Sequence, residues 1–298
     1  MKFNPVLKEL GFAPGDRVVV LHADDVGICQ ASVDAFAALA EQGPLSAGSV
    51  MVPCPAFSAA AALCRARPGI DAGVHLTLTC EWRRRRWKPV AAAGPQSGLV
   101  DAAGRLHRER GAAVALAGPA AVEREIAAQL DAALAAGIEV THLDSHMFAL
   151  ISPRLVAAYV RLARRRRLPA LLWRPDPASR RFSEESAVLT ARRQARWRAQ
   201  GLPVFDRLDA LPLRQPGQRL AQVERWLARL PPGLSQLILH PAVDSPELRS
   251  LTRDWRGRVA DYELLRGPHL ARLLLAHRIQ VIGYRPLRAA LRRTAAGT

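Results

Sequence analysis

The chain has 298 residues, of which 49% are hydrophobic, and its formal net charge is +17 at pH 7. This length suits a (β/α) barrel folded as one domain. No apolar run approaches the roughly 18 residues of a membrane span and the start lacks a signal-peptide pattern, so we expect a cytoplasmic protein without membrane contact. The positive charge comes almost entirely from arginines scattered along the chain, which is typical of a genome-wide composition bias, so nucleic acid is not expected as a partner.

Two adjacent acids, Asp24 and Asp25, follow the first expected strand. That strand covers residues 17–21, an uninterrupted run rich in β-branched residues that comes after a Pro-Gly-Asp turn. Helical periodicity begins at Gln30, so we expect the two acids in a strand-to-helix loop. Such loops commonly carry the chemistry of α/β scaffolds.

A second strand and helix are expected at residues 47–52 and 56–66, and a third strand at residues 71–78. The third strand carries His75 near its far end, level with the acids. From about residue 80 to residue 118 the periodicity fails, and we expect an excursion over the barrel mouth.

The second half of the chain continues the alternation of helices and strands. The expected elements are helix 119–136, strand 139–143, a helix from 153 to about 162, strand 170–174, a polar segment at about 175–200, a return at 204–205, a helix at about 218–230, strand 235–239, a helix around 262–277 and strand 279–283. This alternation predicts a parallel sheet with crossover helices. At this length it favours a TIM-like (β/α) barrel of seven or eight strands, regular or distorted, in one domain spanning residues 1–298.

Acids and histidines gather at or just past the ends of the expected strands. They are Asp24, Asp25, His75, His142, Asp144, His146 and His240. The carboxyl ends of barrel strands share one face, so residues far apart in sequence converge there. Two imidazoles and a carboxylate can bind a divalent metal ion and leave positions open for water and substrate, while a second carboxylate can act as general base.

Each of these residues also has a purely structural interpretation. Asp24 could cap the following helix, and a lone histidine such as His75 more often packs or anchors a loop. Strand alternation could turn His142 away from His146, and Asp144 could orient a ligand imidazole.

Two arginine runs and the cysteines add no chemistry to this picture. Residues 83–86 and 164–167 are arginine runs that we interpret as a solvated loop and a helix end rather than anion contacts. The four cysteines show no C-x-x-C spacing and are expected to be reduced and packed.

Four short stretches resemble, in order and spacing, the YdjC-like carbohydrate deacetylase family, whose best-known members are chitooligosaccharide deacetylases. They are Leu21-His22-Ala23-Asp24-Asp25-Val26-Gly27, Gly73-Val74-His75-Leu76-Thr77-Leu78-Thr79, Thr141-His142-Leu143-Asp144-Ser145-His146 and Leu239-His240-Pro241. The resemblance covers roughly residues 17–285. It implies a (β/α) barrel of the polysaccharide-deacetylase type with a metal ion held by Asp25, His75 and His146. Family members commonly continue the fourth stretch with further histidines, whereas this chain continues with Met147-Phe148-Ala149, which leaves the sugar specificity open.

The predicted function is metal-dependent removal of acetyl groups from N-acetylated amino sugars or oligosaccharides. Asp24 would act as the base and His240 as the acid that protonates the leaving amine, although a His-Pro pair could also serve only to shape the loop. The cofactor is one divalent ion, magnesium or zinc. His142, Asp144, Trp82 and Arg258 are expected to support the site or contact the substrate.

Further expectations concern the aromatic residues, the partners and the rival functions. Trp82, Trp87 and Trp255 could stack on a sugar ring or form half-buried lids. The expected partner is a small carbohydrate, and the Ala-rich helices would permit a homodimer. Rival functions are hydrolysis of another amide, ester or phosphate bond, or a catalytically inactive carbohydrate-binding barrel.

Overall fold

The computed structural model describes residues 4–82, 85–175 and 182–296. Part of the 83–86 arginine run and part of the predicted 175–200 segment therefore lie outside the described residues. Within the described part, no helix combines the length and the apolar character needed to cross a membrane. Cys29, Cys54, Cys64 and Cys80 are free and buried, as expected from their spacing.

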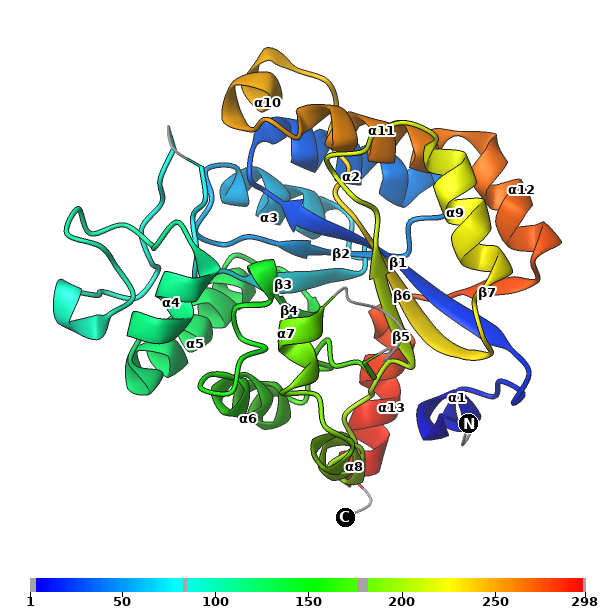
Figure 1. Cartoon of the computed structure of the whole chain (residues 1–298), viewed down its shortest axis with the longest axis horizontal. Coiled ribbons are helices and arrows are strands. Elements are labelled where there is room, and N and C mark those ends of the chain that lie inside the picture. The colour runs from blue at the N-terminus through cyan, green and yellow to red at the C-terminus, as the bar shows by residue number, and fades with distance from the viewer. Residues whose placement is uncertain (1–3, 83–84, 176–181, 297–298) are drawn as a thin grey trace.

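In the part of the chain that the structure describes, seven parallel strands form one central sheet (Figure 1). They are β1 (Arg17–Val26), β2 (Ala47–Val50), β3 (Ala72–Leu76), β4 (Val140–Ser145), β5 (Arg207–Ala210), β6 (Gly233–Leu239) and β7 (Ile279–Val281). Their order is β4-β3-β2-β1-β6-β5, and β7 pairs with the first residues of β1. The predicted class, a parallel α/β sheet with crossover helices, is confirmed.

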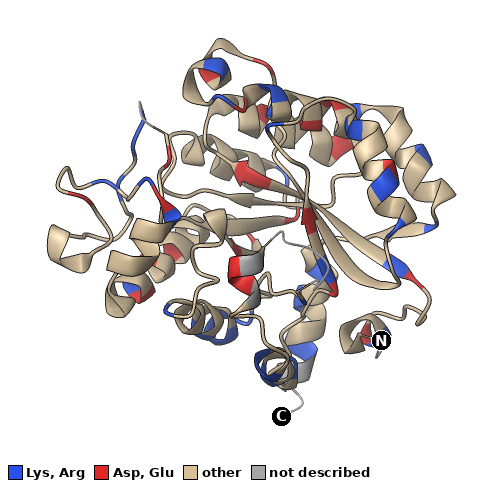
Figure 2. Cartoon of the chain, viewed as in Figure 1, with Lys and Arg blue, Asp and Glu red and all other residues tan. Residues whose placement is uncertain are grey.

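Helices surround the sheet. They are α1 (Pro5–Glu9), α2 (Gln30–Gln42), α3 (Phe57–Ala66), α4 (Arg110–Leu116), α5 (Pro119–Ala135), α6 (Val156–Arg166), α7 (Ser183–Ser186), α8 (Ala191–Ala199), α9 (Arg219–Ala228), α10 (Pro246–Leu251), α11 (Trp255–Arg266), α12 (Pro268–Ala276) and α13 (Tyr284–Ala296), with 3-10 turns η1 (Pro95–Ser97) and η2 (His146–Phe148). In Figure 1, α2, α10 and α11 lie above the sheet, α6, α8 and α13 lie below it, and α9 and α12 lie on its right. Figure 2 shows Lys and Arg spread over helices on all sides of this view rather than gathered into one stripe.

The seven strands do not close into a continuous barrel ladder. The expected strand at residues 170–174 makes only isolated bridges, pairing Leu143 with Ala170 on one side and Trp173 with Phe205 on the other. The backbone N–H of Leu171 is shared between the Leu143 carbonyl and the Tyr159 hydroxyl, both at 2.9 Å. This segment therefore spans the gap between β4 and β5 without forming a regular strand.

Several expected element boundaries were wrong. β1 continues to Val26, so the two acids lie inside the strand and not in the loop after it. The helix expected around 262–277 is two helices, because Pro268 has no N–H to continue the first one and α11 ends before it. Strand β5 lies just beyond the expected return at 204–205, and helix α13 follows the last strand without having been predicted.

Candidate metal centre and active site

A bulge in β1 brings two adjacent carboxylates to the same place. In the pairing of β1 with β2, Ala23 faces Gly48 but Val26 faces Val50, so β1 has one extra residue between these points. Asp25 takes a left-handed conformation with φ 62°, which aspartate tolerates better than most residues. Neighbouring residues of a regular strand point to opposite faces, whereas here Oδ2 of Asp24 and Oδ1 of Asp25 lie 3.8 and 3.4 Å from Nε2 of His75.

The two histidines of the predicted metal site come from β3 and from the end of β4. His75 on β3 lies directly opposite Asp144 of β4 in the strand pairing. His146 is the first residue after β4, where the chain turns into η2. Its Nδ1 lies 3.1 Å from Oδ1 of Asp25 and 3.3 Å from Nε2 of His75. The structure thus brings Asp25, His75 and His146 together from three strand ends.

The outer atom of each of these residues is fixed by a buried or half-buried partner. Nδ1 of His75 donates to Asp144 at 2.7 Å, and Nε2 of His146 donates to Glu81 at 2.8 Å. Oδ2 of Asp25 accepts from Nη1 of Arg258 at 2.8 Å. Metal-binding histidines typically have such a partner on the nitrogen that faces away from the ion.

The three inner atoms fit a metal ion. Oδ1 of Asp25 is buried and has no well-formed hydrogen bond from the described residues. With their other nitrogens donating, neutral His75 and His146 would aim lone pairs at this oxygen, and three electron-rich atoms so close repel one another unless a cation lies among them. Two ligand atoms each about 2.1 Å from an ion are about 3.0 Å apart at a 90° angle and about 3.4 Å apart at the tetrahedral angle. The observed separations of 3.1, 3.3 and 3.4 Å fall in this range.

Without a metal ion, protons take the place of the cation. Burial lowers the pKa of His146, but Glu81 and Asp25 outweigh it and raise the pKa to about 9. Burial raises the pKa of Asp25, but Arg258 and His146 hold it well below its usual range. The pKa of His75 likewise lies well above its usual value, because Asp144 and Asp24 outweigh burial. The site is therefore built for a positive charge at its centre.

The predicted base and acid lie on neighbouring strands. The register pairs Ala23 of β1 with Leu239 of β6, so Asp24 and His240 follow side by side. The backbone N–H of His240 donates to Asp261, while its ring Nδ1 is buried without a hydrogen-bond partner among the described residues. Burial lowers the pKa of His240, against the carboxylates of Asp25 and Asp24, which raise it.

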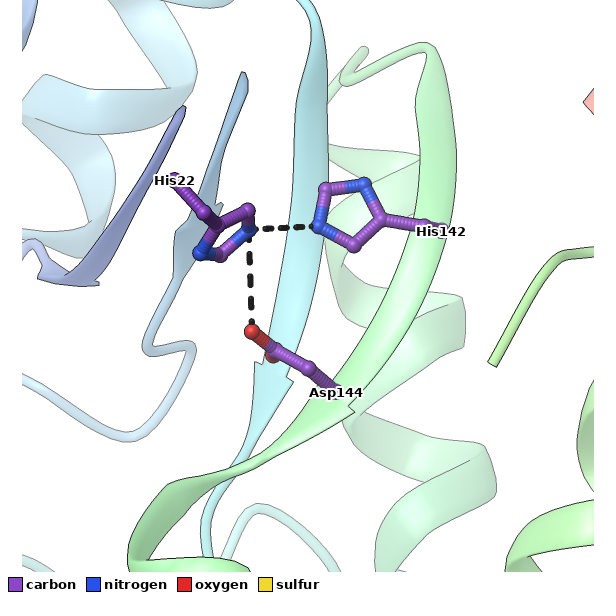
Figure 3. A group of neighbouring side chains, drawn as sticks. All are labelled: His22, His142 and Asp144. Carbon is purple, nitrogen blue, oxygen red and sulfur yellow. Dashed lines mark hydrogen bonds and ion pairs between the residues drawn. The ribbon is translucent and has the colours of Figure 1, made fainter. Parts of the chain in front are cut away.

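A second buried group lies beside the first and was not expected. His22 was not among the predicted site residues. It contacts His142 at 2.8 Å and lies 3.7 Å from Asp144 (Figure 3). Its other ring nitrogen is 2.7 Å from Oδ1 of Asp24. Sequence reasoning also missed Glu81 and Ser49; the latter donates to Asp144 at 2.8 Å. No periodic signal marks Glu81, because it lies in the irregular stretch after β3.

The remaining predicted site residues take different places. Arg258 is buried in α11 and reaches Asp25 directly. Trp82 is buried too, and its ring stacks on His146 with the centroids 5.9 Å apart. Trp82 therefore packs against the candidate metal centre, and its contact with a sugar stays a prediction.

Three comparisons place this geometry among known proteins. Residues 18–276 match a family model described as YdjC-like protein. A carbohydrate deacetylase of Thermus thermophilus is 36% identical over 269 residues, which cover 90% of this chain and 93% of that protein. A carbohydrate deacetylase of Brevibacillus brevis is 30% identical over 151 residues, 51% of this chain and 57% of that protein.

The crystal structure of an Enterococcus faecalis V583 protein, named for a proposed role in cellobiose-phosphate cleavage, superimposes with a TM-score of 0.73. The alignment covers 91% of this chain and 99% of the other, at 19% identity. At this identity the likeness concerns the fold alone.

Proposed function

The chain belongs to the YdjC-like protein family, and on that basis we propose that it is a metal-dependent hydrolase that removes acetyl groups from N-acetylated amino sugars. The names of its relatives support carbohydrate deacetylation. The observation that carries the metal dependence is the convergence of Oδ1 of Asp25, Nε2 of His75 and Nδ1 of His146. A divalent ion held there would polarise the acyl carbonyl and lower the pKa of a coordinated water.

The donor set bears on the choice of metal. Two imidazole nitrogens and one carboxylate oxygen suit zinc and its transition-metal neighbours, whereas magnesium prefers oxygen ligands throughout. Of the two predicted metals, zinc is therefore our proposal.

Asp24 is the proposed general base. Its Oδ1 is hydrogen-bonded to His22, which leaves Oδ2 to take the proton of the attacking water. At 10% exposure, its side chain is slightly more open to solvent than those of Asp25 and Asp144, at 4% and 1%. A base must touch the water that it deprotonates, and this opening would allow it.

His240 is the proposed general acid. The water adds to the acyl carbon, the C–N bond breaks, and the leaving nitrogen takes a proton to become an amine. Because burial lowers the pKa of His240, its protonated ring would give up a proton readily. Among the described residues Nδ1 of His240 has no hydrogen-bond partner, so this ring nitrogen is available to donate to the leaving nitrogen.

The experiment is acetate release from a panel of N-acetylated amino sugars and short oligosaccharides, with zinc or magnesium added. We expect acetate from the wild type and from His269→Gln, which changes an exposed histidine remote from the site, and none from Asp24→Asn. Hydrolysis of other amide, ester or phosphate substrates without acetate release would favour a different hydrolase. Sugar binding without turnover under any metal would favour an inactive binding barrel. The cytoplasmic location and the homodimer stay predictions.

A further inference from the structure

A buried line of hydrogen-bonded side chains leads from Asp71 to the proposed base. Asp71 contacts Thr141 at 2.5 Å, and Thr141 contacts Nδ1 of His142 at 2.9 Å. Nε2 of His142 lies 2.8 Å from Nε2 of His22, whose Nδ1 lies 2.7 Å from Oδ1 of Asp24. His22 and His142 are fully buried, so bulk solvent does not reach their rings. In Figure 3, dashed lines run from the His22 ring to both His142 and Asp144.

The direction of these hydrogen bonds is set at the Asp71 end. Asp71 accepts from the backbone N–H of Arg285 at 2.8 Å, and as a carboxylate it can only accept. The single hydroxyl proton of Thr141 therefore points to Asp71. Since that oxygen then offers only lone pairs, His142 must donate to it from Nδ1.

The ring of His142 is packed tightly, with Nδ1 on Thr141 and Nε2 on His22. One face of its ring stacks on Tyr284 at 3.7 Å, with the planes 10° apart. A Cβ on Gly73 would lie 2.5 Å from Nε2 of His142, so the ring occupies space that only glycine leaves open. Burial holds the pKa of His142 well below its usual range, so the ring is neutral. Its Nε2 is thus an acceptor that faces His22.

His22 must donate at both ends. Its Nε2 donates to His142, because the 3.7 Å to Asp144 exceeds hydrogen-bond distance. Its Nδ1 lies 2.7 Å from Oδ1 of Asp24. Two lone pairs would repel each other at this distance, so a proton lies between the two atoms. As the proposed base, Asp24 is a carboxylate that accepts this hydrogen bond, so His22 donates it.

We propose that His22 is a positioning residue for the general base: its doubly protonated ring, held by His142, fixes Oδ1 of Asp24 and leaves Oδ2 to face the water. This inference rests on the proposed function, in which Asp24 is an unprotonated base that accepts the hydrogen bond from His22. The hydrogen bonds that run from Asp71 through Thr141 and His142 to His22 thus orient the base. On this proposal His22, His142 and Asp144 do not form a second metal site, although their ligand atoms are close enough together to hold an ion.

The protonation of His22 is tested by NMR of the full chain labelled with ¹⁵N-histidine, with His22 assigned by its loss in His22→Gln. We expect both ring nitrogens of His22 to carry protons at pH 7, before and after zinc is added to saturation. An unprotonated nitrogen on His22, or zinc-induced shifts of both His22 and His142 that show direct coordination, would overturn the proposal.

Kinetics test the positioning role. His22→Leu should lower kcat at least about tenfold with KM and bound zinc unchanged, since each 1.4 kcal/mol of lost transition-state stabilisation is a factor of about ten. His22→Gln, which keeps an N–H donor, should recover part of the loss. If His22→Leu keeps the wild-type kcat while Asp24→Asn is inactive, the positioning role of His22 is refuted and the proposed base is not. An active Asp24→Asn would instead refute the proposed base, and the NMR result would still decide how His22 is protonated.

Discussion

Replacing Arg258 by methionine is a direct test of how the metal centre is held. Nη1 of Arg258 donates to Oδ2 of Asp25 at 2.8 Å, and Nε donates to Asp254 at 2.9 Å. Arg258 and Asp25 are each 3% exposed. Methionine fills much of the same volume but removes the guanidinium that Asp25 and Asp254 share. Breaking a buried ion pair by removing one partner costs about 3–5 kcal/mol.

This loss converts into a measurable change in melting temperature. For 298 residues, an unfolding entropy of about 2.1 cal/mol/K per residue gives about 0.63 kcal/mol/K, so the midpoint should fall by about 5–8 °C. The assay is thermal unfolding followed by circular dichroism at pH 7, with a chelator present so that bound metal does not contribute. A depressed pKa of Asp25 stabilises the fold above the unfolded value, so the difference should shrink as the pH falls below about 4.

The matched control is Arg249→Met. Arg249 makes two hydrogen bonds to Asp244, but both residues are exposed, and solvent screens their attraction. We expect no change in its melting temperature. If Arg258→Met has the same melting temperature as the control and the wild type, the buried ion pair does not stabilise Asp25, and our account of the site's electrostatics is wrong.

Three further predictions concern the surroundings of the metal centre. Glu81→Gln weakens the acceptor that orients His146, so metal affinity should fall by about 10–100-fold in competition with a chromophoric chelator; equal affinity would contradict this role. Because the pKa of metal-free His146 is about 9, binding must displace a proton, and wild-type affinity should rise as the pH is raised towards 9, whereas a flat profile would count against His146 as a ligand. Gly73→Ala would place a Cβ 2.5 Å from the His142 ring and should lower the free energy of unfolding in urea by about 1–3 kcal/mol, whereas Gly69→Ala, with open space around it, should not.

The strand-end logic explains how much of the site could be predicted. Apolar runs located β1, β3 and β4, and because parallel strands end on the same side of a sheet, the acids and histidines at these ends could be expected to meet. The choice of Asp25, His75 and His146 among them came from the family resemblance. The bulge that turns both acids towards His75 could not be predicted, because nothing in the apolar pattern distinguishes a strand ending at Leu21 from one that continues to Val26.

The partners of the site depend on long-range packing. Glu81 belongs to the irregular stretch after β3, and Arg258 lies on α11, more than 230 residues beyond Asp25. No short-range periodicity connects them to the metal centre. The role of His22 could not be predicted from the sequence for the same reason. It follows from a contact with His142, which lies on a strand that does not neighbour β1 in the sheet.

The measurement that tests the central claim most directly is zinc binding by titration calorimetry, with the stoichiometry checked by elemental analysis. We predict one ion per chain for the wild type and for His269→Gln, and loss of that ion in Asp25→Ala, His75→Ala and His146→Ala. If the three alanine variants bind zinc as tightly as the wild type, the metal centre is not where these residues meet.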